Sequence, residues 1–133
     1  MLRCSLLLAL ASAVVGVAVP GRGAAEPTPV EQRFTASDAR QLAVSRQLSQ
    51  RGAVFYGAWW CPACTAQKSL FGREAAALLP YVECDRGDEG RERCQAADLR
   101  VYPTWDLDGR RLEGVRSVEE LREWSGIAAE SVN

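Results

Sequence analysis

The chain has 133 residues, with 16 basic and 17 acidic side chains, no histidine and a formal net charge of −1. This length allows one domain with a single hydrophobic core and is too short for two. The balanced charges, interleaved along the chain, argue against nucleic acid as a partner.

The first residues have the pattern of a secretory signal peptide. Arg3 precedes an apolar run at residues 6–19, and small residues follow at 21–25. We expect residues 1–25 to be a signal peptide cleaved near Ala25, with an uncleaved membrane anchor as the alternative. Cys4 precedes the apolar run and would be removed with it. The four remaining cysteines of an exported chain favour two disulfides in an oxidising compartment.

The next segments predict a linker, a helix and a strand. Residues 26–34 are expected to be a linker before a domain at 35–133. Thr35 or Ser37 is expected to cap a helix that runs to about Gln50 and ends at Gly52. The four apolar residues 53–56 then predict a strand buried on both faces.

Two cysteines follow this strand in the sequence Trp-Trp-Cys-Pro-Ala-Cys at residues 59–64. In a strand-to-helix turn, Cys61 falls at the helix N-terminus, where unpaired N–H groups and the helix dipole stabilise a thiolate. We therefore expect Cys61 to be a nucleophile. The two-residue spacer allows Cys64 to close a disulfide with it, and Pro62 suits the first helical position. Trp60 is expected to contact substrate, whereas Trp59 suits core and surface equally.

A zinc site is the alternative interpretation of Cys-x-x-Cys. The remaining pair, Cys84 and Cys94, is separated by nine residues, and the chain offers no histidine. Zinc sites usually supply a second close pair of cysteines or histidines. We therefore expect a redox pair, with no metal and no cofactor.

The rest of the chain predicts alternating helices and strands and then a hairpin. The helix after Cys61 is expected to stop at Pro80, with a bend at Gly72. Its inner side would carry Cys64, Phe71, Ala75 and Leu78, with Gln67, Lys68 and Arg73 elsewhere. Residues 81–84 predict a strand and 92–97 a short helix.

The last elements are a hairpin and a capped helix. Residues 102–107 and 110–115 flank an Asp108-Gly109 turn, which is typical of a two-residue hairpin. Ser117 and Glu120 form a capping box for a helix that ends at Gly126, with Val118, Leu121 and Trp124 facing inward. This order predicts an α/β fold with a mixed central sheet flanked by helices.

Several separated motifs resemble one known family. They read Gly-Ala-x-Trp-Cys-Pro-x-Cys-x-x-Gln-Lys-x-x-Phe-Gly at 57–72, Pro-Tyr-Val-Glu-Cys at 80–84, Tyr-Pro-Thr-Trp at 102–105 and Gly-Val-Arg-Ser at 114–117. Together they resemble the thioredoxin-like domain fused to bacterial, notably cyanobacterial, vitamin K epoxide reductase homologues. The resemblance covers about residues 37–126 and implies a thioredoxin-like fold.

The resemblance also implies roles for particular residues. Cys61 and Cys64 would be the redox pair, and Cys84 with Cys94 a structural disulfide. Pro103 would be a cis-proline facing the pair, and Tyr102 would offer a backbone edge to an extended substrate. Trp60, Pro62, Tyr102 and Pro103 are therefore the expected substrate-binding residues.

By the same resemblance, we expect a protein thiol-disulfide oxidoreductase in a periplasm or thylakoid lumen, with tethering by its N-terminal segment as the alternative to free release. We also expect a monomer. It would oxidise cysteine-containing exported proteins and be re-oxidised by a separate membrane protein of the vitamin K epoxide reductase type. The alternatives are a disulfide reductase or isomerase, or a redox-inactive binding module that docks through Trp59, Trp60 and Tyr102.

Two departures from related proteins concern proton transfer and charge at the cysteines. Ala63 stands where the family commonly has histidine, so Cys61 lacks that cationic neighbour. Phe55 stands where thioredoxins carry a buried acid six residues before the first cysteine. Proton transfer at Cys64 would then fall to water or to a neighbour such as Glu74.

Overall fold

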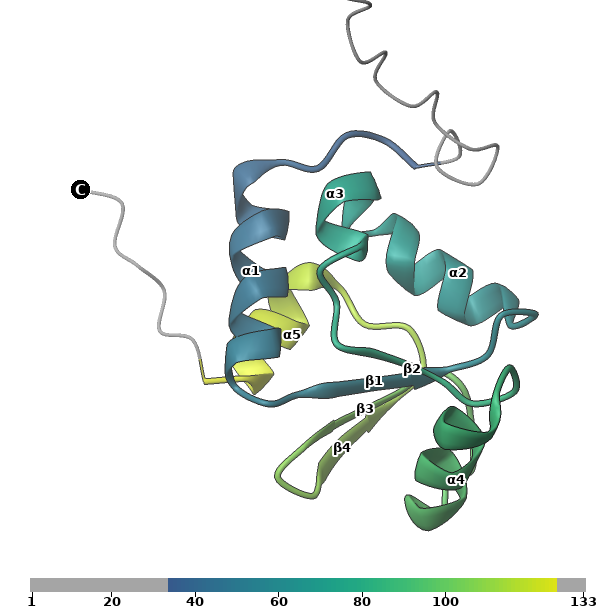
Figure 1. Cartoon of the computed structure of the whole chain (residues 1–133). Helices are drawn as coiled ribbons and strands as arrows, with labels where there is room; N and C mark the ends of the chain where they lie inside the picture. Colours follow the sequence, from purple (N-terminus) through teal and green to yellow (C-terminus); the bar gives the residue numbers. More distant parts are fainter. Residues whose placement is uncertain (1–33, 127–133) are drawn as a thin grey trace, which may run out of the picture.

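The computed structural model describes residues 34–126, in which helices pack around a four-stranded sheet (Figure 1). The elements are α1 (Ala39–Gln50), β1 (Val54–Gly57), α2 (Pro62–Ser69), α3 (Gly72–Ala76), β2 (Tyr81–Glu83), α4 (Asp88–Ala96), β3 (Thr104–Leu107), β4 (Arg110–Glu113) and α5 (Val118–Trp124). The strand order is β2-β1-β3-β4, with β1 and β2 parallel and the other pairs antiparallel. This arrangement confirms the predicted α/β fold of the thioredoxin-like type.

Several predictions about the ends of the chain lie outside the described residues. The expected signal peptide, most of the linker and residues 127–133 are among them. Within residues 34–126, no helix combines the length and apolar character that crossing a bilayer requires.

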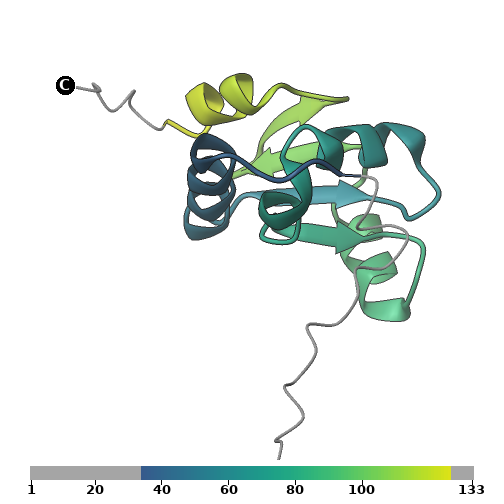
Figure 2. The same cartoon turned by 90° about the horizontal axis from the view of Figure 1, so that it is seen from above.

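The sheet is covered by helices on both faces, and alternating residues of β1 point to each side. Phe55 faces the larger core, where its ring stacks on Trp105 of β3 at a centroid distance of 4.6 Å. Helices α1, α2, α3 and α5 close this core (Figures 1 and 2). Val54 and Tyr56 face a smaller cluster formed with β2 and α4. The strand is therefore covered on both faces, although Val54 and Tyr56 remain half-buried.

The first helix begins at a different residue from the one that the sequence predicts. Asp38 is the N-cap, and its carboxylate accepts a hydrogen bond from the Gln41 backbone while the Gln41 side chain accepts one from Asp38. Ser37 has another role, because its hydroxyl donates to the Phe71 carbonyl and accepts from the Ala75 amide. The expected cap at Thr35 or Ser37 is wrong, since Asp38 with Gln41 completes a reciprocal capping box.

The long helix expected after Cys61 is broken in two at Gly72. Gly72 has φ +76°, a left-handed conformation that suits glycine and ends the helical path of α2. The chain takes a different path after this break, and in the turn that follows α3, Leu79 is buried at 7 % exposure while Leu78 is 40 % exposed. The bend is confirmed, whereas the inward placement of Leu78 is wrong.

Gln67 also lies where the sequence does not place it, at the centre of the larger core. Its amide oxygen accepts from the Trp105 indole (3.3 Å) and the Arg116 backbone N–H (2.7 Å), and its amide nitrogen donates to the Arg116 carbonyl (2.8 Å). Because these bonds satisfy the buried amide, its burial costs little. Gln67 thereby ties α2, which carries both cysteines, to β3 and the start of α5.

The C-terminal elements agree with the prediction. Asp108 and Gly109 both have positive φ in the turn between β3 and β4, and Ser117 with Glu120 forms the capping box of α5. Leu121 is fully buried, and Val118 and Trp124 are half-buried.

Helix α4 starts at Asp88, earlier than the expected residue 92, because Asp88 and Glu89 give its first turn a favourable negative charge.

Candidate active site at the start of α2

Cys61 and Cys64 lie together where β1 leads into α2. Cys61 is the N-cap residue of α2, and its sulfur accepts a hydrogen bond from the Cys64 backbone N–H at 3.2 Å. Pro62 occupies the first helical position, where no N–H donor is needed. The two sulfur atoms are 2.6 Å apart, and both side chains are reduced and buried. A small side-chain rotation would suffice to form a disulfide of normal length.

The two thiols have different surroundings. Burial, followed by the hydrogen bond to Cys61, raises the pKa of the Cys64 thiol to about 12. Cys61 receives the backbone N–H at the helix start, an arrangement that stabilises a negative sulfur. The geometry therefore favours Cys61 as the attacking sulfur and keeps Cys64 protonated at neutral pH.

Aromatic side chains surround the entrance to the pair. Trp59 and Trp60 are 57 % and 52 % exposed, so Trp59 belongs to the surface and not to the core. The Trp60 indole donates to the Asp85 carboxylate at 2.6 Å, and its ring lies edge-on to Tyr102 at 6.2 Å. The Arg86 guanidinium stacks on Trp59 at 4.8 Å. These contacts hold a broad apolar surface beside Cys61.

The segment opposite Trp60 contains the Tyr102–Pro103 peptide bond, which is cis. Pro103 is buried and Tyr102 half-buried against the larger core. The Pro103 carbonyl accepts from the Gly114 amide at 2.8 Å, which links this segment to the end of β4. The structure therefore brings Trp60 and Tyr102 together at the rim of the cysteine pair. Pro103 directly follows Tyr102 in the chain.

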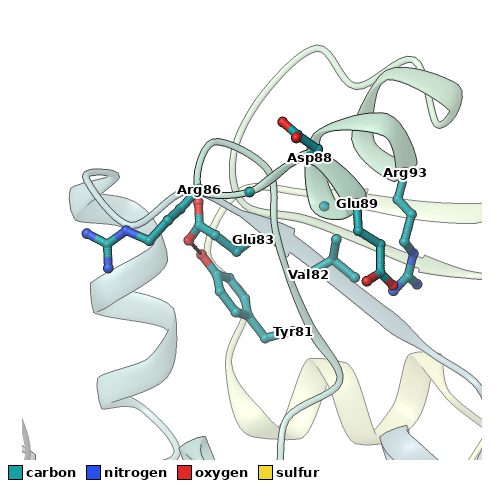
Figure 3. A pocket seen from close by; sticks show the side chains of 9 residues that line it. Tyr81, Val82, Glu83, Arg86, Asp88, Glu89 and Arg93 are labelled. Atoms are coloured by element: carbon teal, nitrogen blue, oxygen red, sulfur yellow. Dashed lines mark hydrogen bonds between the residues drawn. The ribbon is translucent and has the colours of Figure 1, made fainter.

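A polar group that the sequence analysis did not single out lies at the end of β2. The Tyr81 hydroxyl donates to the Glu83 carboxylate at 2.7 Å (Figure 3), and the Lys68 ammonium lies 3.5 Å from the centroid of the Tyr81 ring. Burial opposes ionisation of Glu83, but hydrogen bonds from Tyr81 and from backbone N–H groups outweigh it and lower its pKa. Burial lowers the pKa of Lys68.

One signal in the sequence could have indicated this group. The carboxyl ends of adjacent parallel strands meet at the same edge of a sheet. Glu83 ends β2 and pairs in register with Gly57 of β1, four residues before Cys61. An acid at the end of the second predicted strand was therefore a better candidate neighbour for the cysteines than one in the intervening helix.

Glu74, the neighbour that the sequence analysis named, serves the N-terminal segment. Its carboxylate accepts from the Ser37 backbone N–H at 2.8 Å, and this bond is the main reason why its pKa falls to about 2. It also pairs with Arg73. A role of Glu74 in proton transfer at Cys64 is therefore wrong, because its partners lie at the start of α1 and within α3.

The other two cysteines form a disulfide. Cys84 at the end of β2 is joined to Cys94 of α4, with a Cα–Cα distance of 5.5 Å. Both residues belong to the smaller cluster, on the face of the sheet opposite the larger core. Among residues 34–126, no three or more cysteine, aspartate or glutamate side chains are grouped so that they could hold a metal ion.

A shallow hollow lies between β2 and the start of α4. It has a volume of about 350 Å³, and Figure 3 shows both acidic and basic side chains around it. Two arginines line it together with three acidic residues, so charges of both signs are mixed and the hollow suits no single class of charged ligand; these residues are Arg86, Arg93, Glu83, Asp88 and Glu89.

Comparison with known proteins finds no matching family model, and a curated protein with a related sequence is found. The chain is 37 % identical over 97 residues to the protein named thiol-disulfide oxidoreductase LTO1 of Arabidopsis thaliana. The matched residues cover 69 % of this chain and 26 % of the relative, so the chain spans about a quarter of the length of that protein.

Proposed function

We propose that the chain is an exported protein thiol-disulfide oxidoreductase whose redox pair is Cys61 and Cys64. The observation that carries the proposal is the placement of Cys61 at the N-cap of α2, with the Cys64 sulfur 2.6 Å from its own sulfur. An N-cap cysteine with a partner three residues later is the arrangement that favours reversible disulfide formation. The similarity to a named thiol-disulfide oxidoreductase supports the same reaction.

The proposed direction is oxidation of substrate thiols. A substrate thiolate attacks the Cys61 sulfur of the oxidised pair, which forms a mixed disulfide and releases Cys64. A second substrate thiolate then attacks the mixed disulfide, so that the substrate gains a disulfide and Cys61 becomes a thiolate. Two electrons pass from the substrate to the pair. Trp60 and Tyr102, which lie at its rim, would contact the substrate, with Pro62 and Pro103 next to them.

The proposed location and partner rest on the sequence. Residues 1–25 have the pattern of an export signal, and the motifs at 57–72, 80–84, 102–105 and 114–117 resemble a domain that works with vitamin K epoxide reductase homologues. We propose that the substrates are exported cysteine-containing proteins and that a quinone-linked membrane protein of this reductase type re-oxidises the pair.

A trapping experiment tests the function. In the Cys64→Ser variant of the full chain, the thiol that resolves mixed disulfides is missing, so covalent partners should accumulate on Cys61. The Cys61→Ser variant is the matched control and should accumulate none. Both variants are purified from the native host under acid quenching, and the attached proteins are identified by mass spectrometry.

The trapped partners decide between the alternatives. Exported cysteine proteins together with a polytopic membrane protein of the vitamin K epoxide reductase type would support the proposal. Cytoplasmic reductase components, or a wild-type pair found mostly reduced in the host, would favour a reductase or isomerase. If the Cys64→Ser variant holds no partner at all, the chain is a binding module and the proposal fails.

A further inference from the structure

The proposed exchange leaves one proton without a carrier. Cys64 is 2 % exposed, and its thiol is the stable form because burial, together with the hydrogen bond to Cys61, raises its pKa to about 12. It must nevertheless gain a proton when the disulfide opens and lose one when it closes. The acid that thioredoxins bury six residues before the first cysteine is replaced here by Phe55, which stacks on Trp105 in the core.

We infer that Lys68 is the proton donor and acceptor of Cys64, and that Tyr81 and Glu83 are positioning residues that hold Lys68 in place. The inference rests on the proposed thiol-disulfide exchange. It assigns a role to a side chain that the geometry places beside Cys64 and that the exchange described above does not use.

The placement of Lys68 follows from the spacing along α2. Cys64 and Lys68 are four residues apart in the helix Pro62–Ser69, so their side chains extend from the same face. The charge of Lys68 acts directly on Cys64, because it opposes the rise in the pKa of that thiol. Lys68 is half-buried, whereas a lysine that only improves the solubility of a helix lies in water.

Tyr81 and Glu83 fix the ammonium group from the neighbouring strand. The Lys68 ammonium packs 3.5 Å from the centroid of the Tyr81 ring, and the Tyr81 hydroxyl is held by Glu83 at 2.7 Å (Figure 3). A side chain added at Gly57 would lie 2.8 Å from the Cys64 sulfur and 2.9 Å from the Tyr81 ring, so these two groups border the same space. The groups that face Lys68 are therefore Cys61 and Cys64 from its own helix and Tyr81 and Glu83 from β2.

The type of cation matters for this role. Lys68 is the only lysine of the chain, and the other 15 basic residues are arginines. Arginine stays protonated in proteins, whereas a buried lysine can release its proton. Burial lowers the pKa of Lys68, which brings it closer to the physiological range in which a group exchanges protons well. Glu83 is a poor base, because its hydrogen bonds stabilise the carboxylate.

The step balances in both directions. When a substrate thiolate attacks Cys61, the Cys61–Cys64 bond breaks, the electron pair goes to the Cys64 sulfur, and the Lys68 ammonium protonates it. The neutral amine then takes a proton from water. When the bond closes, the Lys68 amine accepts the Cys64 proton, the thiolate attacks Cys61, and the former partner leaves as a thiolate.

The test separates the two cysteines by time. Full-length chain carrying Cys4→Ser, with the Cys61–Cys64 pair reduced and the Cys84–Cys94 disulfide intact, is mixed with dithiobis-nitrobenzoate, whose thiolate product is coloured. The first release reports attack by Cys61, and the second reports attack by Cys64 on the mixed disulfide. We expect Lys68→Gln to slow the second release by about tenfold or more, as for loss of a positioned acid-base group, and to leave the first nearly unchanged.

Two variants and a pH profile make the result specific. Lys68→Arg keeps the charge but cannot accept a proton, so its second release should be as slow as that of Lys68→Gln. Arg46→Gln removes a charge from an exposed position on α1 and should change neither release. In the wild type, the second release should rise with pH and level once Lys68 is neutral, whereas in Lys68→Gln it should rise without that plateau.

The outcomes distinguish this inference from the proposed function. A wild-type rate of second release in Lys68→Gln, or full recovery in Lys68→Arg, would overturn the role of Lys68 as proton carrier. The wild type and Cys64→Ser are run alongside. If the wild type gives no second release, the exchange reaction itself fails, and the role of Lys68 fails with it.

Discussion

Cys61 and Cys64 belong to one turn of chain and yet have opposite chemical tendencies. Both are buried, at 4 % and 2 % exposure, so accessibility does not distinguish them. The hydrogen bonds do, because the Cys64 N–H points to the Cys61 sulfur, whereas the Cys64 thiol donates to Cys61 and borders the same space as the Tyr81 ring. One sulfur is suited to attack, and the other is suited to stay protonated until it is needed.

The high pKa of Cys64 gives a direct prediction for its labelling. Because burial and the hydrogen bond to Cys61 raise the pKa of Cys64 to about 12, this thiol is almost entirely protonated at pH 8. We therefore expect iodoacetamide to leave Cys64 of the reduced chain unmodified at pH 8, with labelling that grows only as the pH approaches 12. Peptide mapping by mass spectrometry measures both sites separately.

The control removes one cause of the raised pKa. In the Cys61→Ala variant the hydrogen bond that the Cys64 thiol donates to Cys61 is lost while burial remains, so Cys64 should label at a somewhat lower pH than in the wild type. Labelling of wild-type Cys64 at pH 8 at the rate of a free cysteine peptide would contradict the assignment.

The cysteines could be found from the sequence, but the groups that serve them could not. Cys61 and Cys64 belong to a short motif whose geometry depends on local backbone structure. Lys68 and Glu83 meet only because α2 packs beside β2, and Tyr81 provides the contact between them. A sequence pattern shows which face of a helix is buried, whereas the element that packs against this face depends on the arrangement of the whole sheet.

Among the elements, the break between α2 and α3 shows how one backbone position shapes the site. Gly72 has φ +76°, and the Ser37 backbone lies against it. The same break brings the Ala75 amide to the Ser37 hydroxyl and the Arg73 amide to the Thr35 carbonyl. The segment before α1 therefore anchors the end of the cysteine-bearing helix pair.

This close approach makes Gly72 more sensitive to substitution than another glycine with the same φ. A Cβ at Gly72 would lie 2.7 Å from the Ser37 hydroxyl and 2.9 Å from its Cα, whereas Gly52, also at φ +76°, has no atom within 4 Å. We expect Gly52→Ala to lower the free energy of unfolding by about 1 kcal/mol, from the conformation alone. Gly72→Ala should cost about 2–4 kcal/mol, because the clash adds to it. Urea unfolding of both variants measures the difference, and equal losses would show that the contact with Ser37 is unimportant.

Element types were easier to predict than element edges and faces. The order of helices, strands and hairpin follows from periodicity, turns and caps, and the structure has the same order except that the predicted second helix is divided into α2 and α3. The edges depend on competition between neighbouring caps, as with Asp38 and Ser37. The burial of the Gln67 side chain depends on three hydrogen bonds to distant segments, which no local pattern of apolar residues reveals.

At the scale of the whole molecule, the reactive groups gather at one end of the sheet. The carboxyl ends of β1 and β2, the start of α2 and the loop before β3 meet there (Figure 2). The larger core supports α2 from one face through Gln67 and Phe71. The smaller cluster supports β2 from the other face, and there the Cys84–Cys94 disulfide replaces much of the apolar packing.

The two faces should therefore differ in what holds them together. The disulfide joins residues 10 apart in the chain, and closing a loop of this size stabilises a fold by about 2–3 kcal/mol. We expect the double variant Cys84→Ala/Cys94→Ala to lose about this much free energy of unfolding in urea. Amide hydrogen exchange should rise mainly in α4, because that helix packs chiefly on β2.

The reactivity of Cys61 and Cys64 in this double variant shows whether Cys84 and Cys94 form a structural disulfide or a second redox pair. In the double variant, the first coloured release from dithiobis-nitrobenzoate should be unchanged, since Cys61 lies at the start of α2 and the larger core that supports this helix is intact. A loss of stability spread evenly over α1 and α2 would contradict the division into two faces. Loss of the first release while the larger core stays intact would show that Cys84 and Cys94 take part in the exchange.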